Sequence, residues 1–244
     1  MTPVLLVAHG SADPRAAATT RALAREVAAA RPGIDVRVAF LDHRGPRPGE
    51  VLFAFQSCGY RTAVVIPLLL TAAYHGTVDI PEVIASARGE GLVLDVALGA
   101  VLGPVRGVVP GALLDGLVRR LEEPAGARDR DAVVLAAAGT RDATARAGVG
   151  LVSTELGAAL GVPCMVAYAS AAGPTGAEAV MALRAAGAER IVVAAYFLAC
   201  GRLYDTVTRS ALSGCVVAVA RPLGSAREIA GLVLERVADV DQLR

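Results

Sequence analysis

Lysine is absent from this sequence, and all 24 basic residues are arginine. A nucleotide-binding loop of the pattern Gly-x-x-x-x-Gly-Lys-Ser/Thr is therefore excluded, because that loop needs its lysine to contact the phosphates. Acidic and basic residues nearly balance, and the formal net charge of +1 gives no electrostatic reason to expect nucleic acid as a partner. The composition thus argues against P-loop ATPases and against nucleic-acid-binding proteins.

Cysteine clusters and long apolar segments are also missing. The longest segment without Asp, Glu, Lys or Arg, residues 156–177, contains two prolines and four glycines and is a poor membrane span. The N-terminus has no basic start before the apolar residues 4–7, so we expect no signal peptide and a cytoplasmic protein without membrane association. No Cys-x-x-Cys pair exists, so neither a disulfide framework nor a zinc ribbon is expected from the four cysteines, Cys58, Cys164, Cys200 and Cys215.

Short apolar runs alternate with helix-like segments along the first half of the chain. The strand-like runs cover residues 4–8, 34–41, 63–70 and 92–98. Asp13 and Pro14 after the first run are typical of a helix start, and they predict a helix from Pro14 to about Arg31. Strands and helices that alternate at these intervals predict a doubly wound parallel α/β sheet.

The pattern of the first half returns after residue 131. Residues 133–142 line up with residues 4–13, and residues 167–174 line up with residues 39–46. The segment between the two copies is charged, contains Pro and Gly, and lacks apolar periodicity, as linkers do. We therefore predict two repeated α/β lobes, residues 1–121 and 132–244, joined by a linker over 122–131. Two such lobes are expected to face each other across a cleft that binds a small molecule.

Three polar residues of the first copy each follow a strand-like run. His9 follows residues 4–8, and Asp42 and His75 follow the second and third runs at equal steps of 33 residues. Because parallel strands point the same way, residues just beyond their ends gather at one edge of the sheet, where such folds bind ligands. Two imidazoles and a carboxylate at one edge predict a site for a divalent transition metal.

The second copy lacks these candidate ligands. Ala138 stands opposite His9, Ser170 stands opposite Asp42, and Gly201 falls opposite His75 when Asp79 and Asp205 are matched. The first copy also contains the remaining histidine, His43. Only the first lobe is therefore expected to hold a metal.

Two motifs are similar to those of a known family. His-Gly-Ser-x-Asp-Pro-Arg begins at His9, and Pro-Leu-Leu-Leu-Thr-Ala-Ala-Tyr-His-x-x-Val-Asp-Ile-Pro begins at Pro67. Their combination resembles the CbiX/SirB group of class II chelatases, and the resemblance covers essentially the whole chain. It implies a two-lobed lyase that inserts Fe²⁺ or Co²⁺ into sirohydrochlorin for siroheme or cobalamin, within porphyrin biosynthesis. No ATP and no tightly bound cofactor are expected, and the metal ion is a substrate.

The resemblance also implies roles for the candidate ligands. His9 and His75 match the two histidines that bind the metal and accept protons, and Asp42 stands where some members have a glutamate. Neutral imidazole suits both tasks, because its pKa is about 6.5. The adjacent His43 leaves open which residue is the third ligand. A site with nitrogen and oxygen ligands accepts iron, cobalt or nickel, so the sequence does not choose the metal.

Sirohydrochlorin is a polycarboxylate, so further residues at the sheet edge become candidates for binding it. Gly10 and Ser11 offer amide and hydroxyl donors, or they only form the turn between strand and helix. Tyr74 either stacks on the tetrapyrrole or packs in the protein. Arginines in these loops are the expected anchors of the carboxylates or are solvated surface charges, namely Arg15, Arg44, Arg141 and Arg202.

Two other classes of protein remain compatible with the sequence. A metallochaperone or storage module would bind Co²⁺ or Ni²⁺ without turning over a tetrapyrrole. A tetrapyrrole carrier would bind the macrocycle and would not need the histidine pair. For the chelatase we expect a monomer that contains an internal pseudo-dimer.

Overall fold

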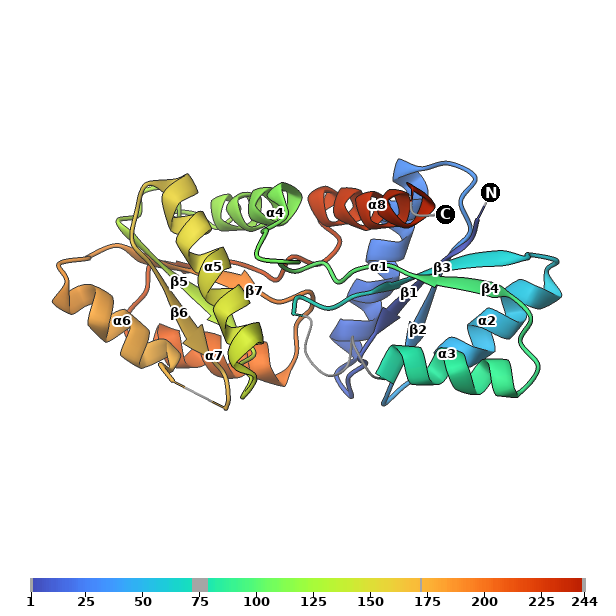
Figure 1. The fold of residues 1–244 in the computed structure, drawn as a ribbon. Helices are drawn as coiled ribbons and strands as arrows, with labels where there is room; N and C mark the ends of the chain where they lie inside the picture. The colour runs from blue at the N-terminus through green and yellow to red at the C-terminus, as the bar shows by residue number, and fades with distance from the viewer. Residues whose placement is uncertain (1, 72–78, 172, 243–244) are drawn as a thin grey trace. The chain divides into compact units, whose positions relative to one another are not determined.

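The computed structural model of the chain describes residues 2–71, 79–171 and 173–242 (Figure 1). The segment 72–78, which contains Tyr74 and His75, lies outside the described residues. The chain divides into two compact units, one formed by Met1–Val105 with Ser225–Arg244 and the other by Arg106–Gly224. No helix in the described part of the chain is long and apolar enough to cross a membrane.

The first unit contains a four-stranded parallel sheet with the strand order β2-β1-β3-β4. Val4 of β1 pairs with Val36 of β2 on one side and with Val64 of β3 on the other, so the three strands end at the same edge. The elements of this unit are β1 (Val4–Ala8), α1 (Pro14–Ala30), β2 (Val36–Phe40), α2 (Pro48–Ser57), β3 (Thr62–Pro67), α3 (Ile80–Gly89), β4 (Asp95–Leu98) and α8 (Arg227–Gln242).

The second unit has the same architecture, with the strand order β6-β5-β7-β8. The N-cap of the first helix after the first strand is also an aspartate in both units. Asp13 accepts a hydrogen bond from the Arg15 amide at the start of α1, and Asp142 accepts one from the Ala145 amide at the start of α5. The structure thus confirms two copies of a parallel α/β sheet. Its elements are α4 (Gly111–Glu122), β5 (Ala132–Ala137), α5 (Ala143–Leu160), β6 (Cys164–Tyr168), α6 (Gly176–Ala185), β7 (Ile191–Tyr196), α7 (Arg202–Leu212) and β8 (Ala218–Val219).

The boundaries of the units differ from the predicted lobes of 1–121 and 132–244. Helix α4 packs on β7 and α5 in the second unit, and α8 packs on α1 and β3 in the first. Each unit therefore takes one helix from the other half of the sequence repeat. The chain crosses between the units near residues 105 and 225, and the predicted linker 122–131 lies inside the second unit.

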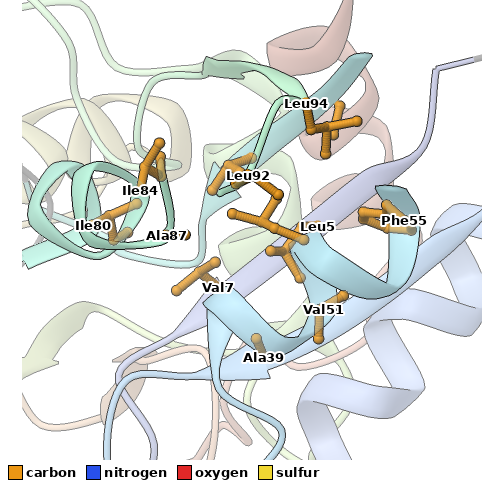
Figure 2. Packing of buried hydrophobic residues seen from close by; sticks show 13 residues of the cluster. Leu5, Val7, Ala39, Val51, Phe55, Ile80, Ile84, Ala87, Leu92 and Leu94 are labelled. Atoms are coloured by element: carbon orange, nitrogen blue, oxygen red, sulfur yellow. The ribbon is translucent and has the colours of Figure 1, made fainter. Parts of the chain in front are cut away.

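A buried apolar layer fixes α2 and α3 on one face of the first sheet. Figure 2 shows Leu5 and Val7 of β1 packed with Phe55 of α2 and with Ile80 and Ile84 of α3. Phe55 has no exposed surface, and Ile80 is 1% exposed. This packing holds the first turn of α3 against the sheet, directly after the segment that carries His75 in the sequence.

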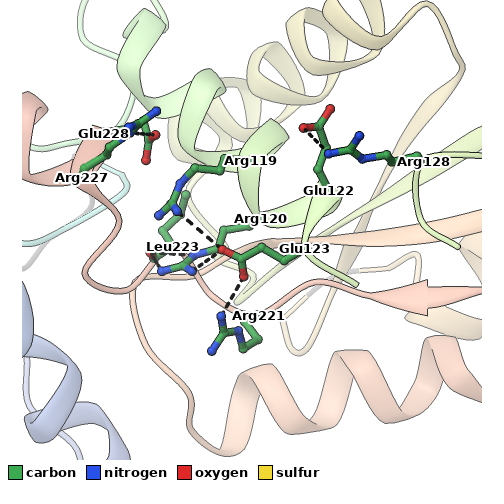
Figure 3. Close-up of polar contacts among 9 residues, drawn as sticks. All are labelled: Arg119, Arg120, Glu122, Glu123, Arg128, Arg221, Leu223, Arg227 and Glu228. Atoms are coloured by element: carbon green, nitrogen blue, oxygen red, sulfur yellow. Dashed lines mark hydrogen bonds and ion pairs between the residues drawn. The ribbon is translucent and has the colours of Figure 1, made fainter. Parts of the chain in front are cut away.

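Arginines anchor the chain just before it leaves each unit. In the first unit, Arg236 of α8 donates from Nε to the carbonyl of Val101 at 3.0 Å. In the second, Arg120 of α4 donates from Nε and Nη2 to the carbonyl of Leu223 at 3.1 and 2.8 Å (Figure 3). In each unit the anchoring arginine comes from the helix that was exchanged.

Glu123 stabilises the anchor of the second unit. Its carboxylate pairs with Arg120 at 2.7 Å and with Arg221 at 2.9 Å (Figure 3). Burial by itself would raise the pKa of Glu123, but the hydrogen bonds from Arg221 and Arg120 outweigh burial and lower that pKa. The carboxylate is therefore ionised at neutral pH and holds Arg120 beside the carbonyl of Leu223.

Candidate metal-binding site

His9 and Asp42 lie next to each other at the carboxyl edge of the first sheet. The hydrogen bonding of β1 and β2 continues beyond both strands, with the Leu41 amide donating to the Ala8 carbonyl at 3.0 Å and the Asp42 amide donating to the His9 carbonyl at 2.8 Å. Both side chains are exposed. The parallel register thus brings together two residues that are 33 positions apart in the sequence.

Gly10 allows the His9 loop (residues 9–13, between β1 and α1) and the Asp42 loop (residues 41–47, between β2 and α2) to approach this closely. Its φ is +98°, a region that residues with a Cβ rarely adopt. A Cβ at this position would lie 2.0 Å from the carbonyl oxygen of Asp42, well inside van der Waals contact. Gly10 thus forms the turn that packs against the Asp42 loop.

The Asp42 carboxylate is held in its ionised form. The His43 amide donates to Asp42 Oδ1 at 2.7 Å, and His43 Nε2 lies 3.6 Å from Oδ2. The hydrogen bond from the His43 amide lowers the pKa of Asp42, and the positive charges of Arg47 and of His43 and His9 in their protonated forms lower it further. An exposed anionic oxygen beside an imidazole is a suitable pair of ligands for a divalent transition metal.

A cavity of about 480 Å³ adjoins this pair. The strand ends form one wall of it, and one face of α3 with its N-cap forms the other. The volume lies within the usual range of small-molecule pockets, roughly 300–1,000 Å³. Its lining residues are His9, Leu41, Asp42, Asp79, Glu82, Val83 and Ser86.

The α3 wall was not anticipated as part of the site. The residues of this wall follow the spacing i, i+3, i+4 and i+7, which places them on one face of a helix. They are Asp79, Glu82, Val83 and Ser86. That spacing is visible in the sequence. However, nothing in the sequence shows that this face lines a cavity.

Arg15 and Arg44 contact groups of this chain. Arg15 Nη2 lies 2.6 Å from Asp13 Oδ2 in an ion pair that lowers the pKa of Asp13. Arg44 donates to the backbone carbonyls of Ser11 and Ala12 at 3.2 and 3.1 Å. A substrate carboxylate at Arg15 would therefore compete with Asp13. Ser11 is also engaged, since its Oγ accepts a hydrogen bond from the Asp13 amide at 3.1 Å.

The second unit repeats the backbone of this site without its ligands. Gly139 has a φ of +92°, and a Cβ there would lie 2.0 Å from the carbonyl oxygen of Ser170. The Ser170 hydroxyl donates to the carbonyl of Ala138 at 3.0 Å, a bond that the ionised Asp42 cannot form. Arg202 is the first residue of α7 and is exposed.

The other predicted site residues, Tyr74 and His75, belong to segment 72–78 and lie outside the described residues. Within residues 2–71, 79–171 and 173–242, no group of three or more His, Cys, Asp and Glu side chains is arranged to hold a metal ion. The described part of the chain therefore supplies two of the three predicted ligands, His9 and Asp42.

Comparisons with known proteins agree with this architecture. The model of the CbiX family matches residues 3–115 and 132–240. A structure of SirB from Bacillus subtilis with Fe³⁺ has a TM-score of 0.84 at 21% identity and covers 98% of this chain and 96% of that chain. The structure of CbiX, the terminal enzyme for biosynthesis of siroheme in denitrifying bacteria, has a TM-score of 0.67 at 20% identity, with 97% and 98% covered. These structures share the fold of this chain.

Curated relatives match a smaller part of the chain. The sirohydrochlorin cobaltochelatase of Methanosarcina barkeri is 27% identical over 82 residues, which is 34% of this chain. That of Methanococcoides burtonii is 27% identical over 81 residues, or 33% of this chain. The chain spans 63% and 62% of the lengths of these two relatives.

Proposed function

Because the chain belongs to the CbiX family, we propose that it is a lyase that inserts Fe²⁺ or Co²⁺ into sirohydrochlorin without ATP. The observation that carries the proposal is the pairing of His9 with Asp42 beside a cavity at the carboxyl edge of the first sheet. The names of two relatives, both sirohydrochlorin cobaltochelatases, support the substrate. Structures of SirB with Fe³⁺ and with cobalt support the choice of metals.

In the proposed mechanism, His9, His75 and Asp42 hold the metal ion through few bonds. Insertion breaks the bonds of the ion to these three residues and two pyrrole N–H bonds, and it forms bonds from the ion to the four ring nitrogens. Two protons are released, and no electron is transferred. His9 and His75 accept these protons once the ion has left them, which neutral imidazole can do near neutral pH. The exposure of His9 and Asp42 supports transfer, because an ion held by exposed ligands keeps open coordination positions for the macrocycle.

The proposal is tested by following the absorbance of sirohydrochlorin with Co²⁺, and with Fe²⁺ under anaerobic conditions. We expect the purified protein to form the metallated product faster than buffer at the same metal concentration. Cobalt binding without any rate enhancement would contradict the proposal and would favour a metallochaperone.

Arg202 is proposed to bind a carboxylate of the macrocycle. Its guanidinium is exposed at the first turn of α7, and a hydrogen bond between two charged groups contributes about 1.5–3 kcal/mol. We expect Arg202→Ala to raise the KM for sirohydrochlorin about tenfold or more and to change kcat less. Steady-state kinetics with varied sirohydrochlorin measure both constants.

The matched control for Arg202 is Arg209→Ala, which removes an exposed arginine from the last turn of the same helix. It lowers the net charge of the protein by the same amount and is expected to leave KM unchanged. An equal KM for the two variants would show that Arg202 does not bind the substrate.

A further inference from the structure

We infer that Arg44 is a positioning residue that fixes the loop of His9 against the loop of Asp42. The inference rests on the proposed function, because it assigns to Arg44 the geometry of two proposed metal ligands. Arg44 lies two residues after Asp42, and its side chain reaches the loop that follows His9. Its Nε donates to the carbonyl of Ser11 at 3.2 Å, and its Nη2 donates to the carbonyl of Ala12 at 3.1 Å.

The two carbonyls need donors from outside helix α1. Ser11 and Ala12 precede the N-cap residue Asp13, whose own carbonyl accepts the first helical bond, from Ala16 at 3.2 Å. The planar guanidinium of Arg44 provides two donors in a fixed fork that suits two neighbouring acceptors. A lysine at this position would offer a single cationic centre and could not reproduce both bonds in the same geometry.

With Arg44, the Asp42 loop contacts four consecutive residues of the opposite loop. The Asp42 amide bonds to His9, the Asp42 carbonyl packs against Gly10, and Arg44 bonds to Ser11 and Ala12. The Asp42 loop is itself closed by a hydrogen bond of 2.7 Å from the Arg44 amide to the Asp42 carbonyl. Without the guanidinium, the backbone hydrogen bonds from Leu41 to Ala8 and from Asp42 to His9 and the packing contact at Gly10 would set the distance between the two proposed ligands.

The second unit forms the same turn without an arginine in the corresponding loop. The residue aligned with Arg44 is Ala172, and the carbonyl of Thr140, which aligns with Ser11, is 3.4 Å from Nη1 of Arg146 on α5. The sheet order and the close approach of Gly139 to Ser170 are nevertheless retained. The fold therefore does not require an arginine at the position of Arg44, and the second unit contacts the matching carbonyl from α5 instead.

The test compares Co²⁺ binding by Arg44→Ala, Arg44→Lys and the wild type, followed through the visible absorption of the bound ion. We expect R44A to bind Co²⁺ about tenfold or more weakly, as substitution of groups that orient metal ligands typically does, and to change the absorption spectrum. R44K should recover part of the affinity because it can still donate to one carbonyl. Arg146→Ala, the matched variant in the second unit, should bind Co²⁺ as the wild type does.

His9→Ala separates failure of this inference from failure of the proposed function. If H9A weakens Co²⁺ binding but R44A and R44K bind as the wild type does, the role of Arg44 is refuted and the metal site stands. If H9A binds as the wild type does, the metal site itself is refuted. Thermal unfolding shows which variants are folded during the titration. If R44A is not folded, the Co²⁺ affinity of R44K relative to the wild type tests the role of Arg44.

Discussion

Replacing His9 with alanine is expected to lower kcat/KM for metal insertion at least about a hundredfold, because a positioned proton acceptor typically contributes 10²–10⁴-fold. The same change removes one of the proposed metal ligands, which lies beside Asp42. The free energy of unfolding should change by no more than about 0.5 kcal/mol, since the side chain of His9 is exposed. His75→Ala is expected to have the same effect on kcat/KM.

Rates of Co²⁺ and Fe²⁺ insertion measure this effect, and chemical denaturation measures stability. The matched control is His43→Gly, which removes the third imidazole and keeps the amide that donates to Asp42. Glycine suits the φ of +62° at this position, so the loop should remain intact. We expect H43G to retain most activity and Asp42→Asn to lose it. The reverse result would make His43 the third ligand, and full activity of H9A would end the proposed mechanism.

The pairing of His9 with Asp42 could be predicted because it depends on strand order and direction alone. Both residues follow apolar strand-like runs, and alternation with helices makes such strands parallel. Once β1 and β2 are neighbours, their register places the two residues side by side. The lack of ligands in the second copy could also be read directly, since Ala138 and Ser170 occupy the matching positions.

The exchange of α4 and α8 could not be predicted, because local sequence does not say which sheet an apolar helix covers. Leu113, Leu117 and Leu121 of α4 form an apolar face, and so do Ile229 and Val233 of α8. Either sheet could bury either face. The charged segment 122–131 also gave a stronger linker signal than the region around residue 105, where the chain does cross.

The roles of Glu82 and Arg44 were missed for a related reason. Glu82 lines the cavity because α2 and the sheet fix the position of α3, which is a long-range effect. Arg44 was considered as an anchor for substrate carboxylates, because a loop arginine near a polyanion site is typical of such anchors. Its actual partners are backbone carbonyls, and no sequence pattern marks those as acceptors.

Replacing Gly10 with alanine should both destabilise the protein and abolish metal binding. The left-handed backbone of Gly10 costs a residue with a Cβ about 1–2 kcal/mol, and forced overpacking typically costs a further 1–3 kcal/mol. The Cβ cannot be accommodated without movement, because it would lie 2.0 Å from a backbone oxygen of Asp42. The clash is removed only if the Asp42 loop moves away from His9. The proposed ligands His9 and Asp42 would then be too far apart to bind the same ion. Chemical denaturation and Co²⁺ titration measure the two effects.

Gly139→Ala is the matched control, because it introduces the same contact of 2.0 Å with Ser170 at a φ of +92°. Its loss of stability should be similar to that of G10A, but its Co²⁺ affinity should equal that of the wild type. Gly59→Ala isolates the backbone contribution, since Gly59 has a φ of +86° and a Cβ added there would meet no atom within 4 Å. Equal Co²⁺ affinities for G10A and G139A would mean that metal binding does not depend on the contact between the His9 and Asp42 loops. If G10A were only as destabilised as G59A, the Asp42 loop would be able to yield at little cost, and Gly10 would not be what sets the distance between the ligands.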